Sequence, residues 1–131
     1  MKKDEIIKEL GDLFVCNLNV DFQDRKTIIE FGINIYEVSK PTKKMIFDNV
    51  IWQEFSQFDF VNIFNSVEID DNFKTFSEKH NLYFEKMKNY ISSDSLEELK
   101  SAKNKFYTFK QTAGFDCFII TKDEIRIEDI I

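Results

Sequence analysis

Glycine, histidine and arginine are all scarce in this chain of 131 residues. The three glycines stand far apart, which excludes a glycine-rich loop of the kind that binds phosphate groups. His80 is the only histidine, so a metal site built from several histidines is also excluded. Arg25 and Arg126 are the only arginines, and bidentate clamps for phosphate are therefore scarce.

The balance of charge excludes a further class of partner. The 24 acidic and 18 basic residues give a formal net charge of -6. Sequence-independent binding of nucleic acid needs clustered lysine and arginine, so we expect no nucleic-acid partner. An acidic surface also repels an anionic membrane.

Long apolar runs are missing as well. No stretch approaches the length of a transmembrane helix, and the first five residues turn acidic before any long apolar run, unlike a secretory signal. We therefore expect a cytoplasmic protein that does not bind membranes. Cys16 and Cys117 are the only cysteines, and in a reducing compartment we expect both thiols to be free.

Core-forming residues are plentiful, since 43% of the chain is hydrophobic and 15 residues are phenylalanine. A chain of this length fits one domain, and we expect residues 1–131 to share a single core. The spacing of apolar residues predicts a short helix over residues 4–14 and then an antiparallel hairpin over residues 17–35, with its turn at residues 23–25.

The middle of the chain mixes two periods. Residues 45–55 keep no strict parity, which indicates a bulge or two short strands. Residues 60–71 fit either a strand or a helical stripe, and their β-branched content favours the strand. From residue 73 to residue 91 the apolar spacing predicts the main helix, and a capping box at Ser95 predicts a second, shorter helix to about residue 103.

The C-terminal part returns to strands. Residues 106–110, 115–121 and 125–130 are separated by short polar turns, a pattern typical of a meander. The sequence therefore predicts an α+β domain with a mostly antiparallel sheet, in which the N-terminal helix and the central helical pair pack on one face. We expect the other face to lie in water and to be free for a partner.

Convergent polar groups, which catalysis requires, are sparse. His80 shares the apolar stripe of the predicted helix with Phe76 and Tyr83, which favours a packing role over that of a catalytic base. Cys117 lies in an apolar strand, a setting that raises a thiol pKa. Glu68 and the run 70–72 carry oxygen ligands, but their spacing does not match a calcium loop. We therefore expect no enzyme, no metal site and no cofactor.

The strongest positive feature is a window between Lys44 and Lys74 that contains no basic residue. Here it is called the acidic window. Aromatic rings alternate with acids in it, so rings in the core would leave carboxylates facing out, a surface that attracts a basic protein. The window includes one tryptophan, Trp52, and six acids: Asp48, Glu54, Asp59, Glu68, Asp70 and Asp71.

A family resemblance adds to this interpretation. The chain is small, acidic and free of catalytic motifs, with the run Ile46-Phe47-Asp48-Asn49-Val50 entering a strand and Tyr107-Thr108-Phe109 through Ile119-Ile120 ending in a hairpin. In these respects it resembles the immunity proteins of bacterial polymorphic-toxin and contact-dependent growth inhibition systems. The resemblance implies an α+β protein that binds a cognate toxin domain, often a basic nuclease, and blocks its active site or a site beside it.

We therefore predict a protein that neutralises a basic toxin, as a monomer or a homodimer, through Trp52 and the six acids of the acidic window. Trp52 is the expected aromatic anchor. Two alternatives stay open. One is a small-ligand-binding or enzymatic domain with a phenylalanine-lined pocket, in which His80 and Tyr83 or Tyr107 make polar contacts. The other is a structural adaptor subunit that associates with itself through an exposed strand.

Overall fold

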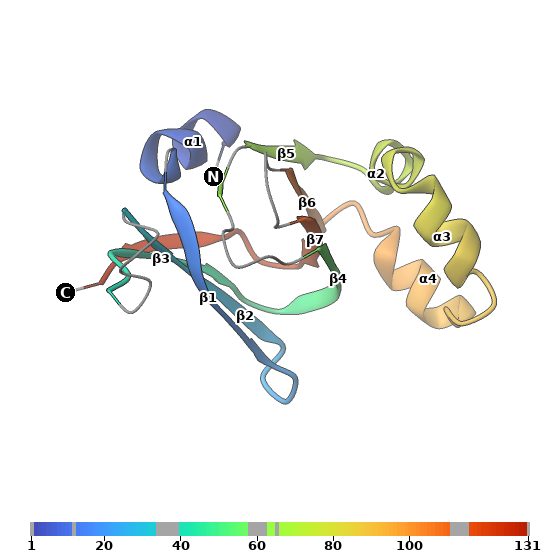
Figure 1. The fold of residues 1–131 in the computed structure, drawn as a ribbon. Helices are drawn as coiled ribbons and strands as arrows, with labels where there is room; N and C mark the ends of the chain where they lie inside the picture. Colours follow the sequence, from blue (N-terminus) through green and yellow to red (C-terminus); the bar gives the residue numbers. More distant parts are fainter. Residues whose placement is uncertain are drawn as a thin grey trace.

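The computed structural model describes residues 2–11, 13–33, 40–57, 63–64, 66–110 and 116–130 (Figure 1). Helices and strands follow the α+β pattern, as predicted. Their order is α1 (Lys3–Leu10), β1 (Phe14–Asp21), β2 (Lys26–Gly32), β3 (Lys43–Phe47), β4 (Val50–Gln57), β5 (Ser66–Asp70), α2 (Phe73–Lys79), α3 (Asn81–Met87), α4 (Ser93–Leu99), β6 (Lys105–Lys110), β7 (Asp116–Thr121) and β8 (Arg126–Asp129).

The described strands form two antiparallel sheets rather than one. Sheet A has the order β1-β2-β3-β8, and sheet B has the order β4-β7-β6-β5. The predicted hairpin is confirmed as β1 and β2, although β1 begins at Phe14, three residues earlier than expected. Its turn covers residues 22–25, where Arg25 adopts a φ of 51°.

Two long strand paths connect the sheets. β3 and β4 follow one another along the chain, as do β7 and β8, while β3 pairs with β8 and β4 pairs with β7. Both paths bend where they leave one sheet for the other, and the bends contact each other. The Asn49 side-chain amide donates to the Asp123 carboxylate at 2.6 Å, and the Lys122 N–H donates to the Asn49 carbonyl at 3.1 Å.

The two bends bear on the predictions for residues 45–55 and for the C-terminal strands. Residues 45–55 are expected to hold a bulge or two short strands. The structure has two strands, β3 and β4, separated at residues 48–49, and the register of β4 against β7 also shifts between Val50 and Trp52. The expectation of a three-stranded meander at the C-terminal end is wrong in its last member. β6 and β7 pair with each other, but β8 pairs with β3 in the other sheet.

The larger core lies between the two sheets. Ile29 and Phe47 from sheet A meet Tyr107 and Ile119 from sheet B, and α1 adds its buried residues from one end (Figure 1). The Phe64 N–H donates to the Leu13 carbonyl at 3.1 Å, which ties the start of β1 to residues near β5. The described strands thus surround this core on most sides.

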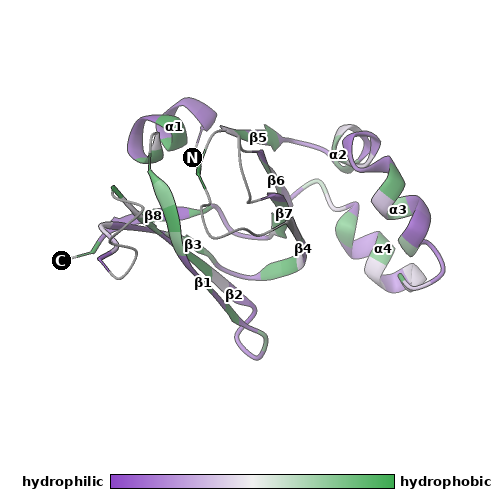
Figure 2. Cartoon of the chain, in the orientation of Figure 1, coloured by the Kyte–Doolittle hydropathy of each residue, from purple (hydrophilic) through white to green (hydrophobic). Residues whose placement is uncertain are grey.

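A second core lies on the outer face of sheet B, where α2, α3 and α4 pack (Figure 1). Along β6, Phe106 points into this outer core and Tyr107 into the larger one. β7 alternates in the same way with Phe118 and Ile119. Strands that are buried on both faces need nearly continuous apolar residues, as in the run Cys117 to Ile120 of β7, which is coloured as hydrophobic in Figure 2.

The central helices differ from the prediction. Where the spacing predicts one helix over residues 73–91, the structure has α2 and α3 with His80 between them at φ -111° and ψ 32°, outside the helical range. Asn72 caps α2 by accepting the Thr75 N–H at 2.8 Å. The shorter helix is confirmed as α4, but its N-cap is Ser92 rather than Ser95.

The sheet face that is free of helices also differs from the prediction. Helices cover the outer face of sheet B, so the sheet face that no described helix covers is the outer face of sheet A. That face carries both signs of charge, including Lys26, Glu30 and Lys44. It is therefore not the purely acidic surface that the sequence suggested.

The bend at Asn49 gives a test of this architecture. Asn49 has a φ of 50°, a conformation that costs an alanine about 1 to 2 kcal/mol and a glycine almost nothing. We expect Asn49→Ala to lower the free energy of unfolding by about 1 to 2 kcal/mol. Asn49→Gly is the control and should be more stable than the alanine variant, measured by urea denaturation. An alanine variant as stable as the parent would contradict the described bend.

Candidate functional site

The helices α2 to α4 leave one end of the outer face of sheet B uncovered. Neighbouring strands align their side chains there in cross-strand rows. The row Trp52, Ile120, Phe106 and Asp70 lies toward the helices, and the row Glu54, Phe118, Thr108 and Glu68 lies at their edge. The second row forms the floor of a cleft.

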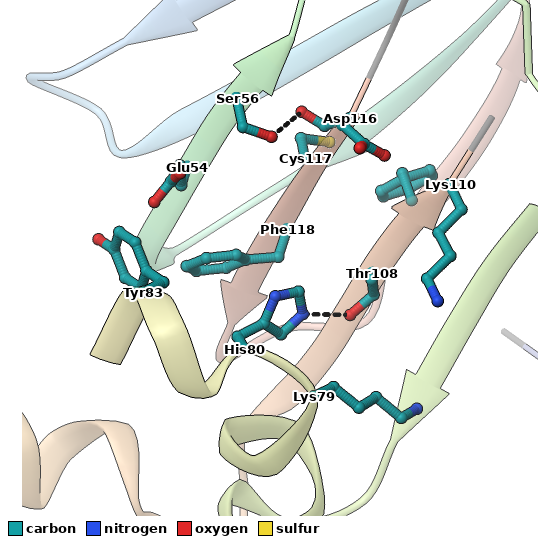
Figure 3. A pocket seen from close by; sticks show the side chains of 11 residues that line it. Glu54, Ser56, Lys79, His80, Tyr83, Thr108, Lys110, Asp116, Cys117 and Phe118 are labelled. Carbon is teal, nitrogen blue, oxygen red and sulfur yellow. Dashed lines mark hydrogen bonds between the residues drawn. The ribbon is translucent and has the colours of Figure 1, made fainter. Parts of the chain in front are cut away.

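This cleft, here called the His80 cleft, has a volume of about 380 Å³ (Figure 3). That volume lies within the range of about 300 to 1,000 Å³ that is usual for small-molecule sites. Its lining residues come from β4, the α2–α3 junction, β6 and β7, and they are Glu54, Ser56, Lys79, His80, Tyr83, Thr108, Phe109, Lys110, Asp116, Cys117 and Phe118.

His80 lies at the centre of the cleft. Its ring packs against Phe76 and Phe118, with centroid distances of 4.6 and 4.8 Å, and its Nε2 shares a hydrogen bond with the Thr108 hydroxyl at 2.9 Å. Burial lowers the pKa of His80, and the positive charge of Lys79 lowers it further, while Asp70 acts in the opposite direction. At neutral pH the imidazole is therefore uncharged and held in place.

One wall of the cleft holds basic residues that are already paired. The Lys79 ammonium lies 2.6 Å from the Glu68 carboxylate and 2.9 Å from that of Asp70. Lys110 lies 3.4 Å from Glu68. The hydrogen bond from Lys79 holds the pKa of Glu68 below its ordinary value. Two lysines and two acids thus neutralise each other on this wall.

The opposite wall holds an acid without such a partner. Glu54 lies beside Tyr83 in Figure 3, and it makes no hydrogen bond or ion pair with any described residue. Burial raises the pKa of Glu54, although Lys86 partly opposes the shift. The cleft therefore has a balanced basic wall and an unbalanced acidic wall. Asp116 adds a second carboxylate that forms no ion pair within the described part of the chain.

Trp52 is fixed next to this acidic wall. Its indole N–H donates to the Tyr83 hydroxyl at 2.6 Å, and its ring packs in the outer core. Trp52 is half-buried, so it supports Tyr83 rather than standing out as an exposed anchor. Any change at the Tyr83 side of the cleft should therefore reach the only tryptophan of the chain.

The other candidate reactive groups face away from the cleft or are inactive. The side chain of Cys117 is buried in the larger core, and burial raises the pKa of its thiol well above the ordinary value. Both cysteines are free, as expected. Tyr107 is also in the larger core, where its hydroxyl accepts the Ile125 N–H at 3.4 Å. Of the tyrosines proposed for a ligand pocket, only Tyr83 lines the cleft.

The residues predicted from the acidic window do not form one surface. Trp52, Glu54, Glu68 and Asp70 share the outer face of sheet B, in the rows described above. Asp48 lies at the bend after β3, where it pairs with Lys26 at 3.5 Å and Arg126 at 2.8 Å. Asp71 is exposed in the turn before α2. Asp59 lies outside the described residues.

Several cleft residues were missed by reasoning from the sequence: Ser56, Lys79, Thr108, Lys110 and Asp116. Of these, only Ser56 lies within the acidic window. The others reach the cleft through strand pairing and through the position of α2, which no local motif reveals. Parity along β6 and β7 was the available signal, because it places Thr108 and Phe118 on the same face.

Comparisons with known proteins give no relative. No protein-family model matches the chain, and no significant match is found among curated proteins or solved structures. None of the helices in the described residues is both long and apolar enough to cross a lipid bilayer. The same residues contain no group of three or more histidine, cysteine or acidic side chains placed to hold a metal ion.

The environment of His80 predicts a pH dependence of stability. Because folding lowers the pKa of His80, the unfolded chain binds a proton more readily, and the stability contributed by the neutral ring is lost as the pH falls below about 6.5. We expect the free energy of unfolding to fall between pH 7 and pH 5, and to fall less in His80→Leu. Urea denaturation across this range measures both slopes, and equal slopes would contradict the buried, neutral His80.

Proposed function

We propose that this chain is a cytoplasmic immunity-type protein that binds and neutralises a basic toxin domain. The His80 cleft and its acidic wall form the centre of the binding surface, and the bound protein blocks the toxin's active site or a site beside it. The observation that carries the proposal is Glu54, a partly buried carboxylate that forms no ion pair with a described residue and whose burial Lys86 offsets only in part. A cationic partner can supply the missing counter-charge.

The surface around Glu54 supports a protein partner. On the other side of Tyr83, Glu54 shares a second, shallow hollow with Phe55, Leu82 and Met87. Leu82 is 86% exposed and Tyr90, just beyond α3, is 79% exposed. Exposed aromatic and other large apolar side chains are enriched at protein interfaces relative to the rest of the surface.

A second candidate is a small-ligand-binding or enzymatic domain that uses the same cleft. What favours it is the polar pair of His80 and Thr108 on the floor of the cleft. Reaction chemistry needs a further nucleophile or acid within reach of His80, and the Cys117 thiol does not meet that need because its pKa is raised. The binding role is therefore preferred.

The proposal predicts that a gene for a basic toxin domain lies directly upstream of this one, and it is tested with the protein that such a gene encodes. Co-expression of the 131-residue chain should restore growth to cells that produce this domain. The purified pair should associate at a rate that falls steeply with salt, because opposite charges steer the encounter. Unchanged toxicity together with no binding between the purified proteins would contradict the proposal.

Charge-reversal variants test whether the His80 cleft is the binding surface. Glu54→Lys should abolish protection, because it places a cation against a cationic partner. Asp24→Lys is the matched control: Asp24 is exposed in the β1–β2 turn of sheet A, and the same change of charge there should leave protection intact. Asp70 is unsuitable for this purpose, since its side chain is only 10% exposed and is paired with Lys79. Equal protection by both variants would remove the cleft from the interface.

A further inference from the structure

The acidic wall of the His80 cleft has a composition that selects one kind of side chain. Glu54 on β4 and Asp116 on β7 are on adjacent strands, and Ser56 lies between them with its hydroxyl donating to the Asp116 carbonyl at 3.2 Å. Tyr83 forms the side of this wall nearest the helices (Figure 3). A carboxylate beside an aromatic ring, as Glu54 lies beside Tyr83, can bind a flat cation through charge-assisted hydrogen bonds and a cation–π contact. Asp116 lies farther from the ring, beyond Ser56 (Figure 3), and adds negative charge to the cleft.

An anion is disfavoured in the same cleft, although two lysines and a histidine line it. Lys79 is held by Glu68 and Asp70, and Lys110 is paired with Glu68. His80 is neutral at physiological pH because its pKa is lowered. Lys86 lies on the outer side of Glu54, in the neighbouring hollow, and forms no ion pair with it among the described contacts. Among the described residues that line the cleft, the charged groups without an ion pair are thus the carboxylates of Glu54 and Asp116.

We infer that the His80 cleft is a subsite for the guanidinium group of an arginine side chain, which the basic partner inserts between Glu54 and Tyr83. This inference rests on the proposed function, since it names the element of the partner that the cleft receives. Arginine fits better than lysine, because its planar group can bind a carboxylate with two hydrogen bonds while it stacks on a ring. The cleft volume of about 380 Å³ is ample for one side chain.

The chain contains its own reporter for this subsite. Trp52 is the only tryptophan, and its indole N–H donates to the hydroxyl of Tyr83, the ring that would contact the guanidinium. A ligand that binds against Tyr83 should therefore shift the single indole N–H resonance of the protein. The assay needs no toxin, so it tests the subsite separately from the proposed function.

The experiment titrates the 131-residue protein with Nα-acetyl-arginine amide and follows the Trp52 indole resonance by NMR. Nα-acetyl-citrulline amide is the matched ligand control, because it has the same shape without the charge. We expect saturable shifts with the arginine compound, and at least tenfold weaker binding with citrulline. Glu54→Gln should weaken arginine binding by about ten- to a hundredfold. Asp24→Asn should leave it unchanged.

Three results would overturn the subsite. The first is arginine binding that Glu54→Gln does not weaken, and the second is no arginine binding at all. The third is a saturable shift with inorganic phosphate in place of the arginine compound, which would mean that the basic wall is the site. If the parent protein still protects against the toxin in any of these cases, the subsite fails while the proposed function stands. Arginine binding without protection would support the subsite and contradict the proposed function.

Discussion

The burial of β6 and β7 on both faces is the constraint on which the rest of the structure depends. Their inward residues build the core between the two sheets, and their outward residues need a cover, which α2, α3 and α4 provide. The helices are short, however, and cover only part of the outer face. The uncovered end keeps Thr108 and Phe118 on its floor and becomes the His80 cleft. The cleft thus exists because the core between sheet B and the helices α2 to α4 ends before the edge of the sheet face.

The break between α2 and α3 belongs to the same arrangement. His80, whose backbone is outside helical geometry, packs against Phe76 and Phe118 and hydrogen-bonds to Thr108. A residue that ends one helix and begins the next thereby lies at the centre of the cleft (Figure 3). The same packing keeps the imidazole neutral, so it contributes shape and a hydrogen bond rather than charge.

The periodicity and capping residues of short segments predict the fold class and the individual elements better than they predict which strands pair. The hairpin of β1 and β2, the split between β3 and β4, and the helix α4 follow from short-range periodicity and capping residues. The pairing of β8 with β3 does not, because it depends on a bend at residues 122–125 that brings distant strands together. A local turn signal is the same whether the next strand pairs with its neighbour or crosses to another sheet.

The same limit applies to the candidate site. The acidic window contains no base, but folding brings Lys26 and Arg126 to Asp48, and Lys79 and Lys110 to Glu68. Charge along the sequence therefore overstated charge on the surface. Of the acids of the window on the outer face of sheet B, Glu54 forms no ion pair with a described residue, whereas Glu68 and Asp70 do. This difference between Glu54 and Glu68 is visible only in three dimensions, although both lie at the ends of one cross-strand row.

That contrast is the most direct test of the account. The carboxyl carbons of Glu54 and Glu68 can be assigned by NMR with single substitutions to glutamine, and titrated in the folded protein. The account predicts that the pKa of Glu54 lies above the ordinary value for glutamate and that of Glu68 lies below it. Equal pKa values, or the reverse order, would contradict an unpaired acid at one end of the row and a paired acid at the other.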